Sequence, residues 1–211
     1  MKKLLILLIV FGLVPLYVGG QSVKSVKKIP KQEVRIVSGN PRDFKKSGAL
    51  LVVFDFSDLN VGEFGREQSY IDYMKDDAEK RKKGTGDSWE RKWYSYRKAI
   101  WQPKFIELFN KFSGASFFAD TIADDQQFTL KLHTQLIEVG FNRNFQKSPT
   151  YINVVATLGS ADNHTNPLVI SMSNIVGDEV FSSYSDDHRR IEEAYAKCGK
   201  ELARFMRSEI F

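Results

Sequence analysis

Two carboxylates lie at the end of the best candidate for a central strand. Residues 49–58 read ALLVVFDFSD, with Asp55 and Asp58 at the end of the run. A Val- and Phe-rich run of this length is typical of a central strand, and open α/β sheets place their binding clefts where strands end. Two carboxylates there can exchange protons with a substrate or hold a cation. The structural alternative, which the sequence favours, is that Asp58 belongs to a turn and Asp55 pairs with a Lys or Arg.

A second candidate site is aromatic. Residues 89–101, WERKWYSYRKAIW, contain all three tryptophans of the chain among Arg and Lys residues. Such rings can stack on sugars or bases, or lie at a membrane interface. The candidate binding residues of this segment are Trp89, Trp93, Tyr96, Arg97 and Trp101. The alternative is a core stripe, because Trp89, Trp93, Tyr96 and Ile100 share one face of a helix.

The remaining polar clusters do not predict a metal or cofactor site. Three histidines offer no pair at a ligand spacing, and the calcium-loop pattern fails after Asp58 because position 63 is Glu instead of Gly. Acidic groups near residues 120–125 and 186–187 fit loop and helix-start positions, where the helix dipole favours carboxylates. We therefore expect no metal and no cofactor.

Nucleophilic and nucleotide chemistry lack their motifs. The sequence contains neither a G-x-S-x-G elbow nor a G-x-x-x-x-G-K-[ST] phosphate loop. The single cysteine, Cys198, lies in a helical pattern, where a buried apolar role is expected. An enzyme is thus less favoured than a binding protein.

The elements that must position these residues follow from periodicity. Alternating or continuous apolar patterns predict strands at 33–37, 49–58, 127–139, 151–158 and 168–176. In the strand at 127–139, Phe128, Leu130, Leu132, Thr134 and Leu136 are expected on one side, and Lys131, His133 and Gln135 on the other. Helical patterns span 66–83, a segment from 88 to 112 capped by Asp87 or Ser88, and 189–211. Pro103 is expected to kink the second helix or to begin another.

This order of elements predicts the fold class. A chain of 211 residues is long enough for one ordinary domain. We expect an α/β sandwich: a mixed, largely antiparallel sheet covered by two amphipathic helices, with a charged helical insertion after the first core strand. The predicted division is a signal peptide at 1–20, a linker at 21–32, and a single α/β domain at 33–211 with the insertion at about 62–88.

Several segments together resemble a known class of exported domains. The strings FDFSD, FIELFNKF, LIEVGF, YINVVATL and RIEEAYAKCGKELARFM occur in an order similar to that of TolB amino-terminal and CsgG-like envelope domains. The resemblance covers about residues 48–211 and implies an α/β domain that binds envelope partners rather than catalysing a reaction. It assigns no functional residue. The chain departs from many relatives in lacking a lipobox Cys and in carrying the charged insertion.

The amino terminus predicts the compartment. Lys2 and Lys3 precede the apolar stretch 4–18, and Gly19-Gly20 supplies the small residues at which a signal peptidase would cleave, leaving Gln21 as the mature start. An uncleaved anchor is the alternative, although the apolar run is short for a membrane span. Such features indicate export to the periplasm or outer envelope of a Gram-negative bacterium, with no transmembrane helix in the mature chain.

Charge and compartment together narrow the partners. The formal net charge is +5, part of it in the signal peptide, and basic residues alternate with acidic ones, so no nucleic-acid partner is expected. We expect an exported, non-catalytic binding or assembly component of the cell envelope that recognises a protein or a glycan. The alternatives are a small secreted hydrolase using Asp55 or Asp58, and a peripheral membrane module using Trp89, Trp93 and Trp101.

Overall fold

The computed structural model describes residues 31–44, 48–122, 127–143, 146–160, 166–177 and 187–210. The predicted signal peptide and nearly all of the predicted linker lie outside this range. Within it, none of the helices combines the length and the apolar character needed to cross a bilayer.

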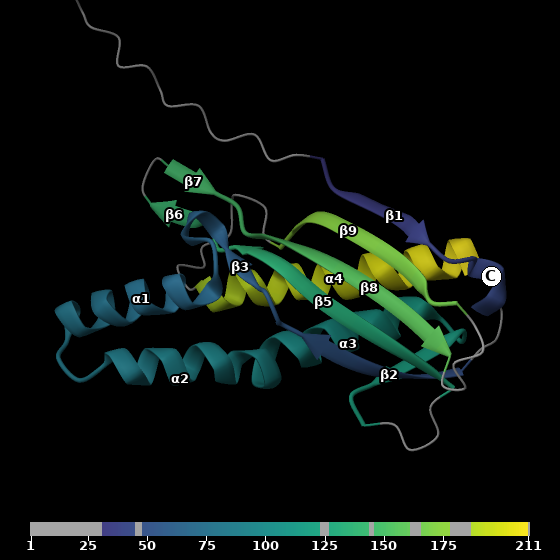
Figure 1. Cartoon of the computed structure of the whole chain (residues 1–211), viewed down its shortest axis with the longest axis horizontal. Helices are drawn as coiled ribbons and strands as arrows, with labels where there is room; N and C mark the ends of the chain where they lie inside the picture. Colours follow the sequence, from purple (N-terminus) through teal and green to yellow (C-terminus); the bar gives the residue numbers. More distant parts are fainter. Residues whose placement is uncertain are drawn as a thin grey trace, which may run out of the picture.

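A mixed sheet of seven strands forms the centre of the described chain (Figure 1). Its strands are β1 (Glu33–Ser38), β2 (Gly48–Asp55), β3 (Asn60–Val61), β4 (Phe117–Asp120), β5 (Phe128–Glu138), β8 (Tyr151–Ser160) and β9 (Leu168–Val176). The order across the sheet is β1-β9-β8-β5-β2-β4, with β3 also paired to β5. The neighbours β1/β9, β9/β8 and β8/β5 are antiparallel, whereas β2 is parallel to β5 and β4. This arrangement confirms the predicted mixed, largely antiparallel sheet.

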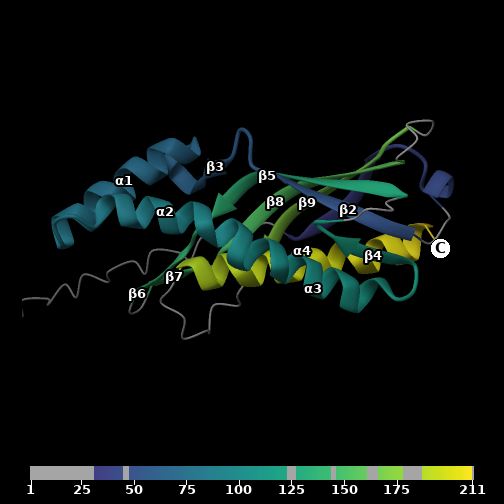
Figure 2. The ribbon, with the colours of Figure 1, turned by 90° about the horizontal axis from the view of Figure 1, so that it is seen from below.

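The helices divide into a covering pair and a projecting pair. Helix α3 (Gln102–Ser113) and helix α4 (Asp187–Ile210) pack against each other on one face of the sheet (Figure 2). Helices α1 (Glu67–Arg81) and α2 (Gly86–Tyr96) form a hairpin that extends beyond one end of the sheet (Figure 1). A π-helix, η3 (Arg97–Trp101), joins α2 to α3, and Pro103 lies in the first turn of α3, so it begins a helix as the sequence allowed.

Shorter elements complete the described chain. Two 3-10 helices, η1 (Pro41–Phe44) and η2 (Gly62–Phe64), follow β1 and β3, and a separate two-stranded hairpin consists of β6 (Phe141–Arg143) and β7 (Gln146–Ser148).

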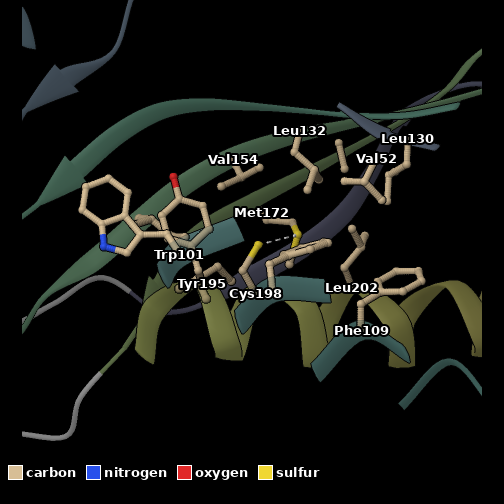
Figure 3. Packing of buried hydrophobic residues seen from close by; sticks show 14 of the residues in the cluster. Val52, Trp101, Phe109, Leu130, Leu132, Val154, Met172, Tyr195, Cys198 and Leu202 are labelled. Atoms are coloured by element: carbon tan, nitrogen blue, oxygen red, sulfur yellow. Dashed lines mark hydrogen bonds between the residues drawn. The ribbon is translucent and has the colours of Figure 1, made fainter. Parts of the chain in front are cut away.

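Alternation along the strands builds the core between the sheet and the two covering helices. Val52, Leu130, Leu132, Val154 and Met172 point from the sheet toward α3 and α4, where Phe109, Cys198 and Leu202 meet them (Figure 3). Each of these side chains is at most 3% exposed. The opposite side of the central strands carries no helix of the described chain (Figure 2), which leaves one face of the sheet open.

Local predictions fail where the backbone departs from regular geometry. A β-bulge between Thr134 and Leu136 shifts the alternation of β5, so Ile137 is buried and Leu136 is not, contrary to the prediction. The first core strand ends at Asp55, three residues earlier than predicted. Neither Asp87 nor Ser88 caps α2, because that helix already begins at Gly86.

Candidate functional site on the open face of the sheet

Two rows of side chains cross the uncovered side of five strands, and together we call these ten residues the open face. Cα partners in successive strands define the first row as Asp55, His133, Val155, Ser171 and Arg35. They define the second row as Val53, Lys131, Thr157 and Val169, with Val37 in the bulge of β1 beside it. Each row runs from β2 through β5, β8 and β9 to β1. The open face is therefore a continuous surface built by strands far apart in sequence.

Asp55 is the centre of an ion-pair cluster on this surface. Its Oδ2 accepts a hydrogen bond from Lys131 Nζ at 2.8 Å and lies 3.2 Å from His133 Nδ1. The backbone N–H of Ser57 donates to Oδ1 at 2.8 Å. The Lys131 ammonium, followed by the hydrogen bonds of Ser57, holds the pKa of Asp55 well below its usual range. Asp55 therefore stays ionised at neutral pH and has no proton to deliver as a general acid.

Asp58 has a different environment. It adopts a positive φ of 58° in the turn after β2, and its side chain is 77% exposed. Arg66 Nη1 donates to its Oδ1 at 3.3 Å. The structure thus confirms the alternative weighed from sequence, in which Asp58 belongs to a turn and Asp55 pairs with a cation.

The lowered pKa of Asp55 predicts a pH-dependent contribution to stability. An Asp whose pKa falls on folding stabilises the native state fully above about pH 4, its unfolded value, and loses that contribution as the pH falls toward the folded value. We expect Asp55→Asn to lower the free energy of unfolding by about 1–2 kcal/mol at pH 7, and the deficit to shrink at pH 3. Urea unfolding at both pH values measures this difference.

The control for this prediction is Asp58→Asn. Its carboxylate is exposed, and Asn tolerates a positive φ, so the free energy of unfolding should change by less than about 0.5 kcal/mol at either pH. An Asp55→Asn deficit that is the same at pH 7 and pH 3 would contradict the charged pairing.

Two of the three tryptophans lie in the core. Trp93 and Trp101 are both 0% exposed, and Trp89 is half-buried, stacked on Trp93 with ring centroids 5.8 Å apart. Trp93 Nε1 donates to Glu67 Oε1 at 2.5 Å, and the Trp101 ring stacks on Tyr195 at 5.8 Å. The core alternative is correct for Trp93 and Trp101, whose rings are not accessible to a glycan or a bilayer. Trp93 and Trp101 therefore cannot be the binding or membrane-contacting rings that the sequence suggested for this segment.

Arg97 and Tyr96, the other predicted members of the aromatic site, also have internal partners. Arg97 forms a largely buried ion pair with Glu67, and its guanidinium lies 4.3 Å from the centre of the Phe56 ring. Tyr96 faces His188 at 3.9 Å between ring centroids. Tyr96 also lines an open groove of about 440 Å³ between α3 and the start of α4. Residues 89–101 therefore mainly pack the hairpin of α1 and α2 against the core.

Tryptophan fluorescence tests this burial. In Trp89→Phe, Trp93 and Trp101 are the only tryptophans left, and both are 0% exposed. We expect blue-shifted emission that acrylamide barely quenches, because the rings are excluded from water. Quenching as strong as that of the same variant unfolded in urea would contradict the buried positions.

Other residues considered from sequence take structural roles or lie outside the described range. Asp120 accepts hydrogen bonds from the N–H groups of Thr121 and Ile122 in its own turn. Cys198 is 1% exposed, its thiol donates to Met172 Sδ at 3.7 Å (Figure 3), and burial raises its pKa. Positions 124, 125, 164 and 186 are outside the described residues. Over the described ranges, no three His, Cys, Asp or Glu side chains gather as a metal site would require.

The sequence left part of the open face unidentified. The alternation correctly predicts that Lys131 and His133 lie on the polar side of their strand. It does not predict that they lie beside Asp55, because the register between two strands cannot be derived from either strand alone. Arg35, Val37 and Val53 lie in predicted strands, but no sequence pattern marks them as surface residues. Their exposure, 52% for Val37 and 41% for Val53, is seen only in the structure.

Comparison with known proteins gives only distant likenesses. The sequence matches no protein-family model and no curated protein. Among solved structures, the PelC dodecamer of Paraburkholderia phytofirmans aligns with a TM-score of 0.36 at 10% identity, over 78% of this chain and 97% of the other. A variant of that PelC aligns with a TM-score of 0.33 at 10% identity, over 79% of this chain and 97% of the other. The similarity to TolB and CsgG domains stays a prediction from sequence.

Proposed function

We propose that the chain is an exported, non-catalytic component of the bacterial cell envelope that assembles with a protein partner through the open face. The observation that carries the proposal is the one-sided sheet: α3 and α4 cover one face (Figure 2), and on the other face all ten residues of the five strands are exposed or partly exposed. An antiparallel sheet can leave one face in water, but that face is then available to a partner. Export rests on the signal-peptide pattern at residues 1–20.

The chemistry of the open face suits a protein partner. Its ten residues include four valines and two hydroxyl side chains, and an exposed ring on the same side of the sheet, Phe118, lies outside them on the edge strand β4. Its acidic group, Asp55, is neutralised by Lys131 at 2.8 Å. A glycan groove would call for aromatic platforms, and a nucleic-acid surface for unpaired cations. Aliphatic, hydroxyl and paired charged groups are instead the composition of a moderately polar protein interface.

Photo-crosslinking in cells tests the proposal. A photoreactive amino acid at Thr157, in the middle of the open face, should yield crosslinked products. The same group at Ser208, exposed on α4, is the matched control and should yield none. Equal yields from the two positions, or no product from either, would contradict assembly through the open face. Amino-terminal sequencing of the same protein tests export, which requires a mature start near Gln21.

One observation favours a second candidate, a hydrolase. The 3.2 Å contact between Asp55 Oδ2 and His133 Nδ1 is the kind that orients an imidazole as a general base. In that case the base would be His133, because the lowered pKa of Asp55 makes its carboxylate a weak proton acceptor. Loss of turnover of a small ester or glycoside panel in His133→Ala, with normal Thr157 crosslinking, would support the hydrolase; absence of turnover in the unmodified protein would remove it.

A further inference from the structure

We infer that the partner of the open face is a second copy of this chain, packed face to face about a twofold axis that runs along β8. The inference rests on the proposed function, because it assigns an occupant to the same surface. It comes from the register of the strands, which makes the open face complementary to itself.

The position of β8 determines which strands of the two copies face each other. It is the central strand of the five, with β5 and β2 on one side and β9 and β1 on the other. A twofold axis along β8 places each strand of one copy over the strand equally distant on the opposite side of the second copy. Strand β5 then faces β9, and β2 faces β1. Such an isologous contact requires that every residue find its complement within the same chain.

The first row of the open face meets this requirement. Its order is Asp55, His133, Val155, Ser171 and Arg35, so the axis sets Asp55 of one copy opposite Arg35 of the other. His133 meets Ser171, which offers a hydroxyl to the imidazole. Val155 meets its own symmetry mate on the axis. Two opposite-charge pairs therefore flank a central apolar contact.

The second row differs from the first: it has valines at its ends, and the axis sets Lys131, whose ammonium is bound to Asp55 at 2.8 Å, opposite Val169, against which its aliphatic stem can pack. Val53 on β2 and Val37 on β1 lie at opposite margins of the five strands and are 41% and 52% exposed. The same axis sets Val53 of one copy opposite Val37 of the other, so this contact forms twice in the dimer. These are two of the most exposed aliphatic side chains of the described strands, and face-to-face packing removes both from water.

Both members of the proposed Asp55–Arg35 pair keep an oppositely charged partner within their own copy. The Arg35 side chain is 58% exposed, and its Nε lies 3.4 Å from Glu33 Oε1 at the sheet edge, so the exposed guanidinium can pair with a second carboxylate. Asp55 uses Oδ1 for the Ser57 amide and Oδ2 for Lys131 and His133. The Ser57 hydroxyl also bonds to this carboxylate, so all of its acceptor sites, about four, are filled, and Arg35 of the second copy contributes through charge from beside the cluster instead of through a further hydrogen bond. The pairing favours this register over shifted ones.

The size of the face predicts a weak dimer. Five strands about 4.8 Å apart, shared over about six residues of 3.3 Å each, present about 500 Å² per copy. Two copies then bury about 1,000 Å², which is at the low end for a specific interface. We expect reversible association with a dissociation constant in the micromolar range.

Sedimentation of the purified protein tests the association. Val155→Glu puts two like charges on the twofold axis and should weaken dimerisation at least about ten-fold. Ile122→Glu is the control, since Ile122 is 79% exposed and lies off the open face, and it should dimerise as the unmodified protein does. Equal weakening by both variants, or none by either, would overturn the inference. Circular dichroism confirms that each variant is folded.

A charge reversal tests the register. Arg35→Glu would set two carboxylates opposite each other and should weaken association, whereas Arg91→Glu, the same change of charge on exposed α2, should not. If Arg35→Glu leaves the dissociation constant unchanged, the proposed facing of Asp55 and Arg35 is wrong.

Spin-label distances test the symmetry. The single native cysteine is buried, so introduced cysteines are labelled selectively. Thr157→Cys lies on the axis and should give a backbone separation of about 10 Å between copies, while Glu33→Cys, on β1 two strands away and outside the ten residues of the open face, should give about 20 Å. A distance for Thr157→Cys that is equal to or longer than that for Glu33→Cys would overturn the face-to-face dimer.

The results separate this inference from the proposed function. If the purified protein stays monomeric at several hundred micromolar while Thr157 crosslinks to a different protein in cells, the second copy is excluded and the assembly function stands. If Thr157 forms no crosslink in cells and the purified protein is monomeric, both fail.

Discussion

Gly199→Val is expected to abolish folding or to remove about 3 kcal/mol or more of the free energy of unfolding. Gly199 lies in α4 where that helix meets α3, and a Cβ atom added there would lie 2.3 Å from the carbonyl oxygen of Phe105 and 3.1 Å from the amide nitrogen of Phe109. Both atoms belong to a helix backbone, which cannot move aside as a flexible side chain would. Relief requires the two helices to separate, and the core beneath them is packed too densely for that to be cheap.

The size of the effect follows from what the helix pair covers. Helices α3 and α4 bury the apolar side of the sheet, so a wider helix spacing exposes core side chains such as Phe109 and Leu202. A domain of this class is stable by about 5–15 kcal/mol, so a loss of this size is a large fraction of the total. Urea unfolding followed by far-ultraviolet circular dichroism measures it.

Gly159→Val is the matched control. Gly159 lies in β8, and a Cβ atom there would have no neighbour within 4 Å. A β-branched residue suits a strand, so the free energy of unfolding should change by less than about 1 kcal/mol. Similar losses in the two variants would show that close helix packing is not what Gly199 provides.

Much of the fold could be predicted because its patterns are local. The period of α4 places Ile191, Cys198 and Leu202 on one face, and all three are buried. The alternation of β5 from Phe128 to Thr134 is likewise visible in sequence, since successive side chains of a strand point to opposite faces.

The wrong predictions have a common physical cause: each concerns a feature that depends on pairing or packing between elements distant in sequence. Strand β4 is only four residues long and pairs with β2 at the sheet edge, so it has too few residues for a period. The bulge after Thr134 is imposed by pairing with β8 and reverses the sides of the residues that follow. Tyr195 stabilises this point, because its hydroxyl bonds to Thr134 Oγ1 at 2.8 Å from a helix distant in sequence.

The same reason explains the partial prediction of the candidate site. Asp55 was identified because a carboxylate after an apolar strand is conspicuous, but its partners Lys131 and His133 are set by the register of β2 with β5. The spacing of the tryptophans is the same for a buried stripe as for a binding stripe. Only the packing of α2 against α1 and of η3 against α4 distinguishes the two.

Arg190→Met is expected to destabilise the protein by about 2–3 kcal/mol. Arg190 lies in the first turns of α4 and is 4% exposed, and its guanidinium fastens that helix to the chain between β5 and β8. Nε donates to Thr150 Oγ1 at 3.2 Å, and Nη2 donates to the Val139 carbonyl at 3.3 Å and to Asp187 Oδ1 at 2.5 Å. Methionine keeps an unbranched apolar stem but cannot donate, so buried acceptors lose charged partners.

Arg204→Met is the control that separates loss of the buried contacts of Arg190 from loss of a positive charge on α4. Arg204 is on the same helix but 47% exposed, with a 3.7 Å ion pair to Glu201 and a guanidinium 4.7 Å from the centre of the Phe112 ring. Exposed contacts of this kind contribute less than about 1 kcal/mol. Hydrogen exchange should show faster opening of the first turns of α4 in Arg190→Met and unchanged exchange there in Arg204→Met. Equal effects at both positions would mean that loss of helix charge, and not the buried anchor between α4 and the sheet, sets the stability of this end of the helix.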